Sequence, residues 1–149
     1  MKKKFLALIV AAMILFNSSF ANGKDNEVNS TVLTSFSQQF EKATDVNWTK
    51  TEIYFKVTFT WNGQNLSAFY DANGESIAVS RNILPTDLPL ILQTNLADTY
   101  SGYWVSDLFE NSIKDNSKYY ITIENADKKI ILESMDRNYW SMFKKSTKE

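Results

Sequence analysis

The sequence predicts an α+β fold in which an antiparallel β-sheet, built from meander hairpins, packs on two helices. Three observations support this prediction. Alternating apolar runs joined by Asn-Gly pairs fill residues 52–81, and Asn-Gly between such runs is the strongest short-range signal for a hairpin. Apolar residues at helical spacing precede residue 44 and recur after residue 87. A second pair of alternating runs follows residue 117.

The first 21 residues have the pattern of a secretory signal peptide. Three lysines precede an apolar run at 5–16 that is too short to span a bilayer, and small residues stand at Ser19 and Ala21. We expect cleavage after Ala21, a flexible start at 22–29 and one domain over 30–144. The mature protein should therefore be periplasmic or secreted, with no membrane insertion after the signal is removed.

The composition excludes several kinds of chemistry. Beyond residue 21 the chain has 13 basic and 17 acidic residues, and this balance argues against nucleic acid as a partner. His and Cys are absent, which removes Cys nucleophiles, His general bases and the usual transition-metal sites. We expect no cofactor and no metal, because Asp71 to Glu75 resembles a calcium loop only superficially, with Gly74 two positions too early.

The first helix should begin near Ser30 or Thr31, either of which can cap it, and end near 44–45. Its apolar stripe consists of Leu33, Phe36, Phe40 and Ala43. A short extended piece at 46–50 follows, in which Trp48 should pack on the helix or on the sheet edge.

The two Asn-Gly pairs, Asn62-Gly63 and Asn73-Gly74, are each predicted to form a type I′ turn, because Asn and Gly accept the positive φ that this turn needs. Each turn fixes a register, and the second one pairs Tyr70 with Ile77. The two registers agree on the buried face, whose predicted members are Phe55, Val57, Phe59, Leu66, Ala68, Tyr70, Ile77 and Val79.

The opposite face of this meander is mostly Thr, Ser and Asn, but it includes two aromatic rings. The register places Tyr54 opposite Asp71 and Lys56 opposite Phe69. An exposed sheet face that carries aromatic rings suits the docking of a protein, so Tyr54, Lys56 and Phe69 are the candidate binding residues. The alternative is that a neighbouring segment covers both rings.

The second half of the chain follows the same order. Asp87 should cap a second helix that carries Leu88, Leu92 and Leu96 on one side and ends near 100–101. The later elements are expected at 103–110 (a strand of ambiguous face), 111–117 (a polar turn), 118–125 and 129–135 (two strands that share an apolar side), 139–144 (a last strand) and 145–149 (a frayed tail). Ala126-Asp127 or Asp127-Lys128 forms the turn between the paired strands. The likeness of 30–82 to 83–144 indicates two α-β repeats.

A set of turn and core residues also carries a resemblance to a known family. The set consists of Phe36 and Phe40 before Val46-Asn47-Trp48, then residues 54–59, 71–74, Leu88-Pro89 and 119–123. With these residues the chain resembles the PepSY-like domains of secreted bacterial proteins, sometimes labelled β-lactamase-inhibitor-like, over nearly all of its mature length. It departs from them at Glu41, where a Pro is usual, and at Tyr139, where the second Asp-x-Asn lacks its Gly. The resemblance implies the fold and identifies no catalytic residues.

Two classes of function remain. The favoured one is a non-enzymatic secreted or periplasmic binding module, inhibitor-like, that docks a protein or peptide of the cell envelope through a sheet face. The rival is an envelope hydrolase that uses carboxylates or a Ser-Lys pair, for which a pocket with converging carboxylates of shifted pKa would be the sign. A glycan-binding module is a third alternative, and it predicts a row of exposed rings among Trp48, Trp61, Trp104 and Trp140.

Overall fold

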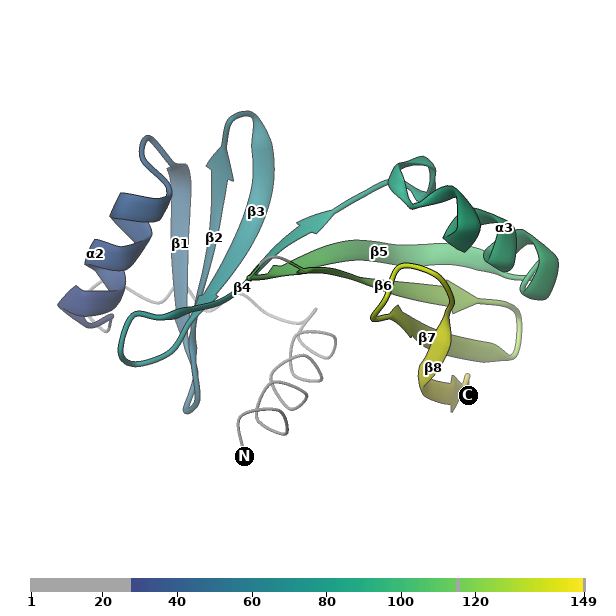
Figure 1. Cartoon of the computed structure of the whole chain (residues 1–149). Coiled ribbons are helices and arrows are strands. Elements are labelled where there is room, and N and C mark those ends of the chain that lie inside the picture. Colours follow the sequence, from purple (N-terminus) through teal and green to yellow (C-terminus); the bar gives the residue numbers. More distant parts are fainter. Residues whose placement is uncertain (1–27, 115, 149) are drawn as a thin grey trace.

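The protein forms one eight-stranded antiparallel sheet with two α-helices, and the strands lie side by side in chain order (Figure 1). This computed structural model describes residues 28–114 and 116–148. The elements are α2 (Ser30–Gln39), β1 (Thr44–Lys50), β2 (Phe55–Trp61), β3 (Gln64–Tyr70), β4 (Ser76–Asn82), the 3₁₀ turn η2 (Pro85–Asp87), α3 (Leu90–Thr99), β5 (Trp104–Ile113), β6 (Asn116–Glu124), β7 (Lys128–Ser134) and β8 (Ser141–Thr147). The predicted α+β class is confirmed, and each helix precedes four strands.

Helix α2 is shorter than the sequence pattern predicts. Its N-cap is Asn29, whose side-chain oxygen accepts the N–H of Val32 at 2.9 Å, rather than Ser30 or Thr31. The helix ends at Gln39 because the chain then turns through Lys42, at φ 63°, and enters β1 at Thr44. The predicted signal peptide at 1–21 and most of the flexible start lie outside the described residues, whereas Val28 is buried and Asn29 caps the helix.

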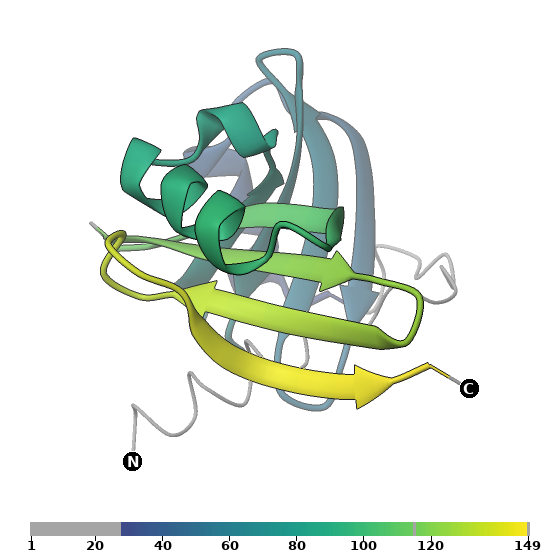
Figure 2. The same cartoon turned by 90° about the vertical axis from the view of Figure 1, so that its right-hand side faces the viewer.

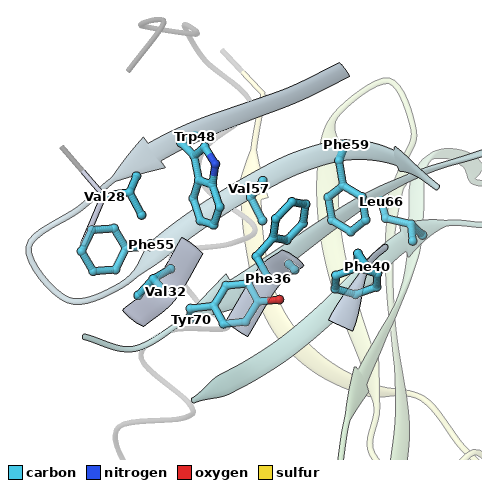
Figure 3. Packing of buried hydrophobic residues seen from close by; sticks show 11 residues of the cluster. Val28, Val32, Phe36, Phe40, Trp48, Phe55, Val57, Phe59, Leu66 and Tyr70 are labelled. Carbon is cyan, nitrogen blue, oxygen red and sulfur yellow. The ribbon is translucent and has the colours of Figure 1, made fainter. Parts of the chain in front are cut away.

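The first core lies between α2 and strands β1 to β3 (Figure 3). Phe36 is at its centre, with ring centroids 5.3 Å from Trp48 and 4.9 Å from Phe59. This confirms that Trp48 packs on the helix. The stripe predicted for α2 also supplies Phe40, while Leu33 is only partly buried.

The first predicted hairpin is confirmed in every pair, from Phe55 opposite Tyr70 to Trp61 opposite Gln64. Asn62 and Gly63 have φ of 49° and 75°, as a type I′ turn requires. All six of the β2 and β3 residues assigned to the buried face are buried.

The second predicted turn is wrong. The Asp71 carboxylate accepts the N–H groups of Asn73 and Glu75, and this builds a longer loop in which only Gly74 has positive φ. A β-bulge at the end of β3 absorbs the extra length, so Tyr70 pairs with Ser76 instead of Ile77. Ile77 therefore leaves the first core and packs on the opposite face.

The second core lies between α3 and strands β5 to β8. Asp87 does not cap α3: its carboxylate accepts the Leu84 N–H and closes the 3₁₀ turn, and α3 begins after Pro89. The predicted shared side of β6 and β7 is confirmed, and it meets Leu92 of α3 in this core. The turn that joins these strands has Ala126 and Asp127 at its centre, because Asn125 N–H bonds to Lys128 O.

The last strands are longer than predicted. Strand β5 runs to Ile113, which shortens the polar turn, and β8 runs to Thr147, which includes part of the tail that was expected to fray. Within the described ranges, neither helix is long and apolar enough to cross a membrane.

Candidate functional site: the helix-free face of the sheet

Both helices lie on the same face of the sheet. Val79 packs on the first core, and its cross-strand partner Ser112 lies four residues along β5 from Leu108 of the second core. Cross-strand partners share a face, and so do residues an even number apart on one strand. We call the other side, which none of the described helices covers, the helix-free face (Figure 1).

One polar row crosses six strands of the helix-free face. Successive cross-strand pairs join Asn47, Thr58, Ser67, Ser80, Asn111 and Lys118. Over β1 to β4 this row forms the floor of a shallow hollow of about 390 Å³, lined also by Asp45, Asn65 and Asn82. Hydroxyl and amide groups thus dominate this half of the face.

An aromatic trio begins where the hollow ends. Phe109 lies opposite Asn82 on one side and opposite Tyr120 on the other. Its ring stacks on Tyr120 with centroids 5.3 Å apart, and Phe143 contacts Tyr120 edge-on at 6.0 Å. Tyr120 is buried, whereas Phe109 and Phe143 are half-buried. We call these three residues the aromatic trio.

The candidate binding residues are not arranged as the sequence predicts. Tyr54 and Phe69 do meet, with centroids 5.6 Å apart on the helix-free face, but they are only 4% and 3% exposed. They form a small core with Ala78 and Ile113, because the pairing of β5 with β4 brings Ile113 beside Ala78 on this face. The expectation that both rings are exposed is therefore wrong, and the alternative that they are covered describes them better.

Lys56 remains half-exposed beside this small core. Its ammonium lies 5.8 Å from the centroid of the Phe69 ring, a cation–π arrangement. Partial burial of the ammonium, which disfavours its charged form, lowers the pKa of Lys56 from the usual value. Lys56 is thus the one candidate that can still touch a partner.

The carboxylates with shifted pKa do not converge. Burial alone would raise the pKa of Glu110, but hydrogen bonds from Ser117 and Arg81 hold it below its usual value. Glu110 is on the helix-bearing face, 2.8 Å from Arg81, and Glu124 is bound to Lys148 near the β6–β7 turn. Each of these two carboxylates is paired with a cation, which is typical of ion pairs that stabilise a fold. Among the described residues, no cluster of acids suited to a metal ion occurs.

The four tryptophans do not form an exposed row. Trp48 is buried, Trp61 and Trp140 are half-buried, and Trp104 alone of these four is exposed. The indole N–H groups of Trp61 and Trp140 donate to main-chain carbonyls of Glu41 and Leu92. Three of the four rings therefore serve packing.

Comparison with solved structures finds the same fold in several bacterial proteins. A BLIP-like protein from Bacteroides fragilis has a TM-score of 0.68 at 15% identity, over 83% of this chain and 92% of that one. A protein proposed to be periplasmic, from Bacteroides eggerthii, has 0.71 at 11%, over 80% and 88%. A DUF2874 family protein from Bacteroides uniformis has 0.70 at 15%, over 80% and 88%. No family model and no curated protein sequence matches the chain. The protein thus shares the fold of the BLIP-like and DUF2874 structures.

Proposed function

We propose that this protein is a non-enzymatic binding module of the cell envelope, periplasmic or secreted, that docks a protein or peptide on the helix-free face. Its role would be inhibitor-like, through occlusion of the partner's surface. The observation that carries the proposal is the aromatic trio, two of whose rings, Phe109 and Phe143, are half-exposed on the face that none of the described helices covers.

The trio has the properties of a binding anchor. Aromatic residues dominate the energy of many interfaces, above all where neighbouring contacts exclude water. Phe109 and Phe143 both rest on the buried ring of Tyr120, so little side-chain freedom is lost when a partner binds. The polar row and the hollow beside the trio supply the hydrogen-bonding rim that such interfaces show.

Each residue has its own part in this proposal. Phe109 and Phe143 contact the partner, and Tyr120 supports them. Lys56 contributes a charge at the far end of the face, above the covered rings of Tyr54 and Phe69, which hold it in place.

The fold supports the same proposal. The BLIP-like neighbour and the neighbour proposed to be periplasmic both fit a binding module of the envelope. We place the chain with the PepSY-like domains on the turn and core residues given above. A hydrolase is disfavoured because Glu110 and Glu124 are far apart in the sheet and each is bound to a cation.

The test is a comparison of two surface variants of the mature protein. The first carries Phe109→Ser with Phe143→Ser, and the matched control carries Leu90→Ser, which removes a 77%-exposed apolar side chain from α3. Each protein is immobilised, exposed to envelope extract, and its retained proteins are identified by mass spectrometry. The binding of each partner found is then measured with purified components.

We expect the trio variant to bind the partner at least about ten-fold more weakly, as loss of a hot spot does, and the control to bind like the parent. A trio variant that melts like the parent and retains every partner would refute the proposal. Hydrogen exchange on the parent complex gives a second readout that needs no variant. Protection that avoids β5, β6 and β8 would refute it equally.

A further inference from the structure

Strand β8 is a free edge of the sheet. Its pairing runs from Ser141 opposite Glu133 to Thr147 opposite Lys128, and no other described strand pairs with its outer side. Figure 2 shows β8 in yellow as the outermost strand. A free edge presents unpaired N–H and C=O groups, which are a template for another strand.

The C-terminal end of this edge strand is held in place by the contacts of Lys148. The Lys148 N–H donates to Asp127 O, and its ammonium donates to Asn125 O, each at 2.9 Å. The same ammonium pairs with Glu124 at 2.6 Å and lies 4.6 Å from the Trp104 ring centroid. A strand fixed beyond its last residue loses little freedom on pairing, so it is pre-organised for a partner.

The edge is positively charged on both sides. Lys144 pairs with Ile131, whose neighbour on β6 is Thr122 of the helix-free face, whereas Lys145 pairs with Ile130 of the second core. Both lysines are exposed, and neither forms an ion pair with a described residue. Lys144 and Lys145 thus make this edge locally positive in a chain whose overall charge is −1.

The positive charge of Lys144 and Lys145 determines which kinds of strand can pair favourably with the outer side of β8. A second copy aligned antiparallel would bring lysines against lysines, and like charges opposite each other destabilise a strand pair. A neutral strand gains main-chain hydrogen bonds but no charge pairing. A strand with two consecutive acidic residues gains both, because its successive side chains also point to opposite faces and can meet Lys144 and Lys145.

We propose that β8 is a docking edge for an extended acidic segment of another protein, which adds one strand to the sheet. Main-chain hydrogen bonds provide the affinity and the two lysines provide the selectivity, as in other cases of strand addition. This interaction uses the main-chain groups and the two lysines of β8, which shares only Phe143 with the aromatic trio, so it does not depend on the docking proposed above.

The experiment uses short synthetic peptides of alternating threonine and valine with capped ends. Their two central residues are both glutamate, both glutamine or both lysine. Each peptide is titrated into the mature ¹⁵N-labelled protein, and amide shifts are followed. We expect the glutamate peptide to shift the amides of 141–147, and to bind at least about five-fold more tightly than the glutamine peptide. Added salt should reduce this difference.

Two variants complete the test. Lys144→Glu with Lys145→Glu should lose the preference for the glutamate peptide and acquire one for the lysine peptide, which a misfolded protein could not do. Lys50→Glu, a single charge reversal of the same kind on edge strand β1, should behave like the parent. The proposal is wrong if the glutamine peptide binds equally well, if no peptide shifts 141–147, or if the shifts fall on β1 to β4 instead. Phe109→Ser, which removes the half-exposed trio ring that lies outside β8, should retain peptide binding, which separates this test from that of the proposed function.

Discussion

The indole N–H of Trp140 donates a hydrogen bond to the main-chain carbonyl of Leu92 at 3.0 Å, across 48 residues of sequence. Beside it, the Asn95 side-chain amide donates to Asn138 O, also at 3.0 Å. The β7–β8 loop thus holds the middle of α3 against the sheet. Both contacts come from the residues on either side of Tyr139, the position at which the second Asp-x-Asn lacks its Gly.

Trp140→Phe tests the contact between the loop and the helix. The variant keeps an aromatic ring but loses the donor, and we expect a loss of about 1–2 kcal/mol in the free energy of unfolding. Tyr139→Phe, at a residue that is 61% exposed, should change stability by less than about 0.5 kcal/mol. Urea unfolding of the three proteins measures both effects. Equal losses at the two positions would show that the hydrogen bond contributes little.

The two turn glycines should respond differently to alanine. Gly63 and Gly74 both have positive φ, but a Cβ at Gly63 would meet nothing within 4 Å, whereas at Gly74 it would lie 2.7 Å from Ser35 Oγ. Gly63→Ala should therefore cost only the left-handed strain, about 1 kcal/mol. Gly74→Ala should cost at least about 1 kcal/mol more, because the turn must move off α2. If the two variants unfold at the same urea concentration, the turn does not pack on the helix as described.

Removing the rings of the small core on the helix-free face should destabilise the protein. Tyr54 and Phe69 are buried together, and replacing a buried aromatic ring by a small residue costs about 3–5 kcal/mol. We expect Tyr54→Ser with Phe69→Ser to lower the melting temperature strongly, and Phe109→Ser with Phe143→Ser to lower it less. Thermal unfolding followed by circular dichroism measures both. A stable Tyr54, Phe69 double variant would show that these rings are exposed in solution.

The first hairpin could be predicted because local rules determine it. Asn62-Gly63 sets the turn, and the strict alternation on β2 and β3 leaves one register that buries Phe59 and Leu66 together. The prediction of a type I′ turn at Asn73-Gly74 failed because the Asp71 carboxylate accepts two main-chain N–H groups. Those bonds favour a longer loop over the two-residue turn that Asn73-Gly74 alone would form.

The candidate site was predicted less well, because it depends on contacts distant in sequence. Alternation placed Tyr54 and Phe69 on the correct face, but it could not show that β4–β5 pairing brings Ile113 into one cluster with them. The aromatic trio was missed for the same reason. Phe109 meets Tyr120 only in the β5–β6 register, which includes a bulge near Ser106 that no turn motif marks. The sequence did show an aromatic residue on each of these two strands, but the strand that carries Phe109 had an ambiguous face, so the pair could not be recognised without that register.

Glu124 should make stability depend on pH through its contacts with the end of β8. The hydrogen bond from Lys148, followed by that from Ser106, lowers the pKa of Glu124 to about 2. In the unfolded chain the carboxyl has a pKa of about 4.5, so the folded protein favours the ionised form. This contribution is complete above pH 4.5 and is lost as the pH falls towards 2. Glu124→Gln should thus be less stable than the parent at pH 7, and the difference in the free energy of unfolding between the two proteins should narrow between pH 4.5 and 2.

Lys148→Met should raise the pKa of Glu124, which NMR titration of its side-chain carboxyl carbon measures. A constant gap at all pH values, or a pKa of Glu124 that Lys148→Met leaves unchanged, would show that the ion pair does not hold the C-terminal strand.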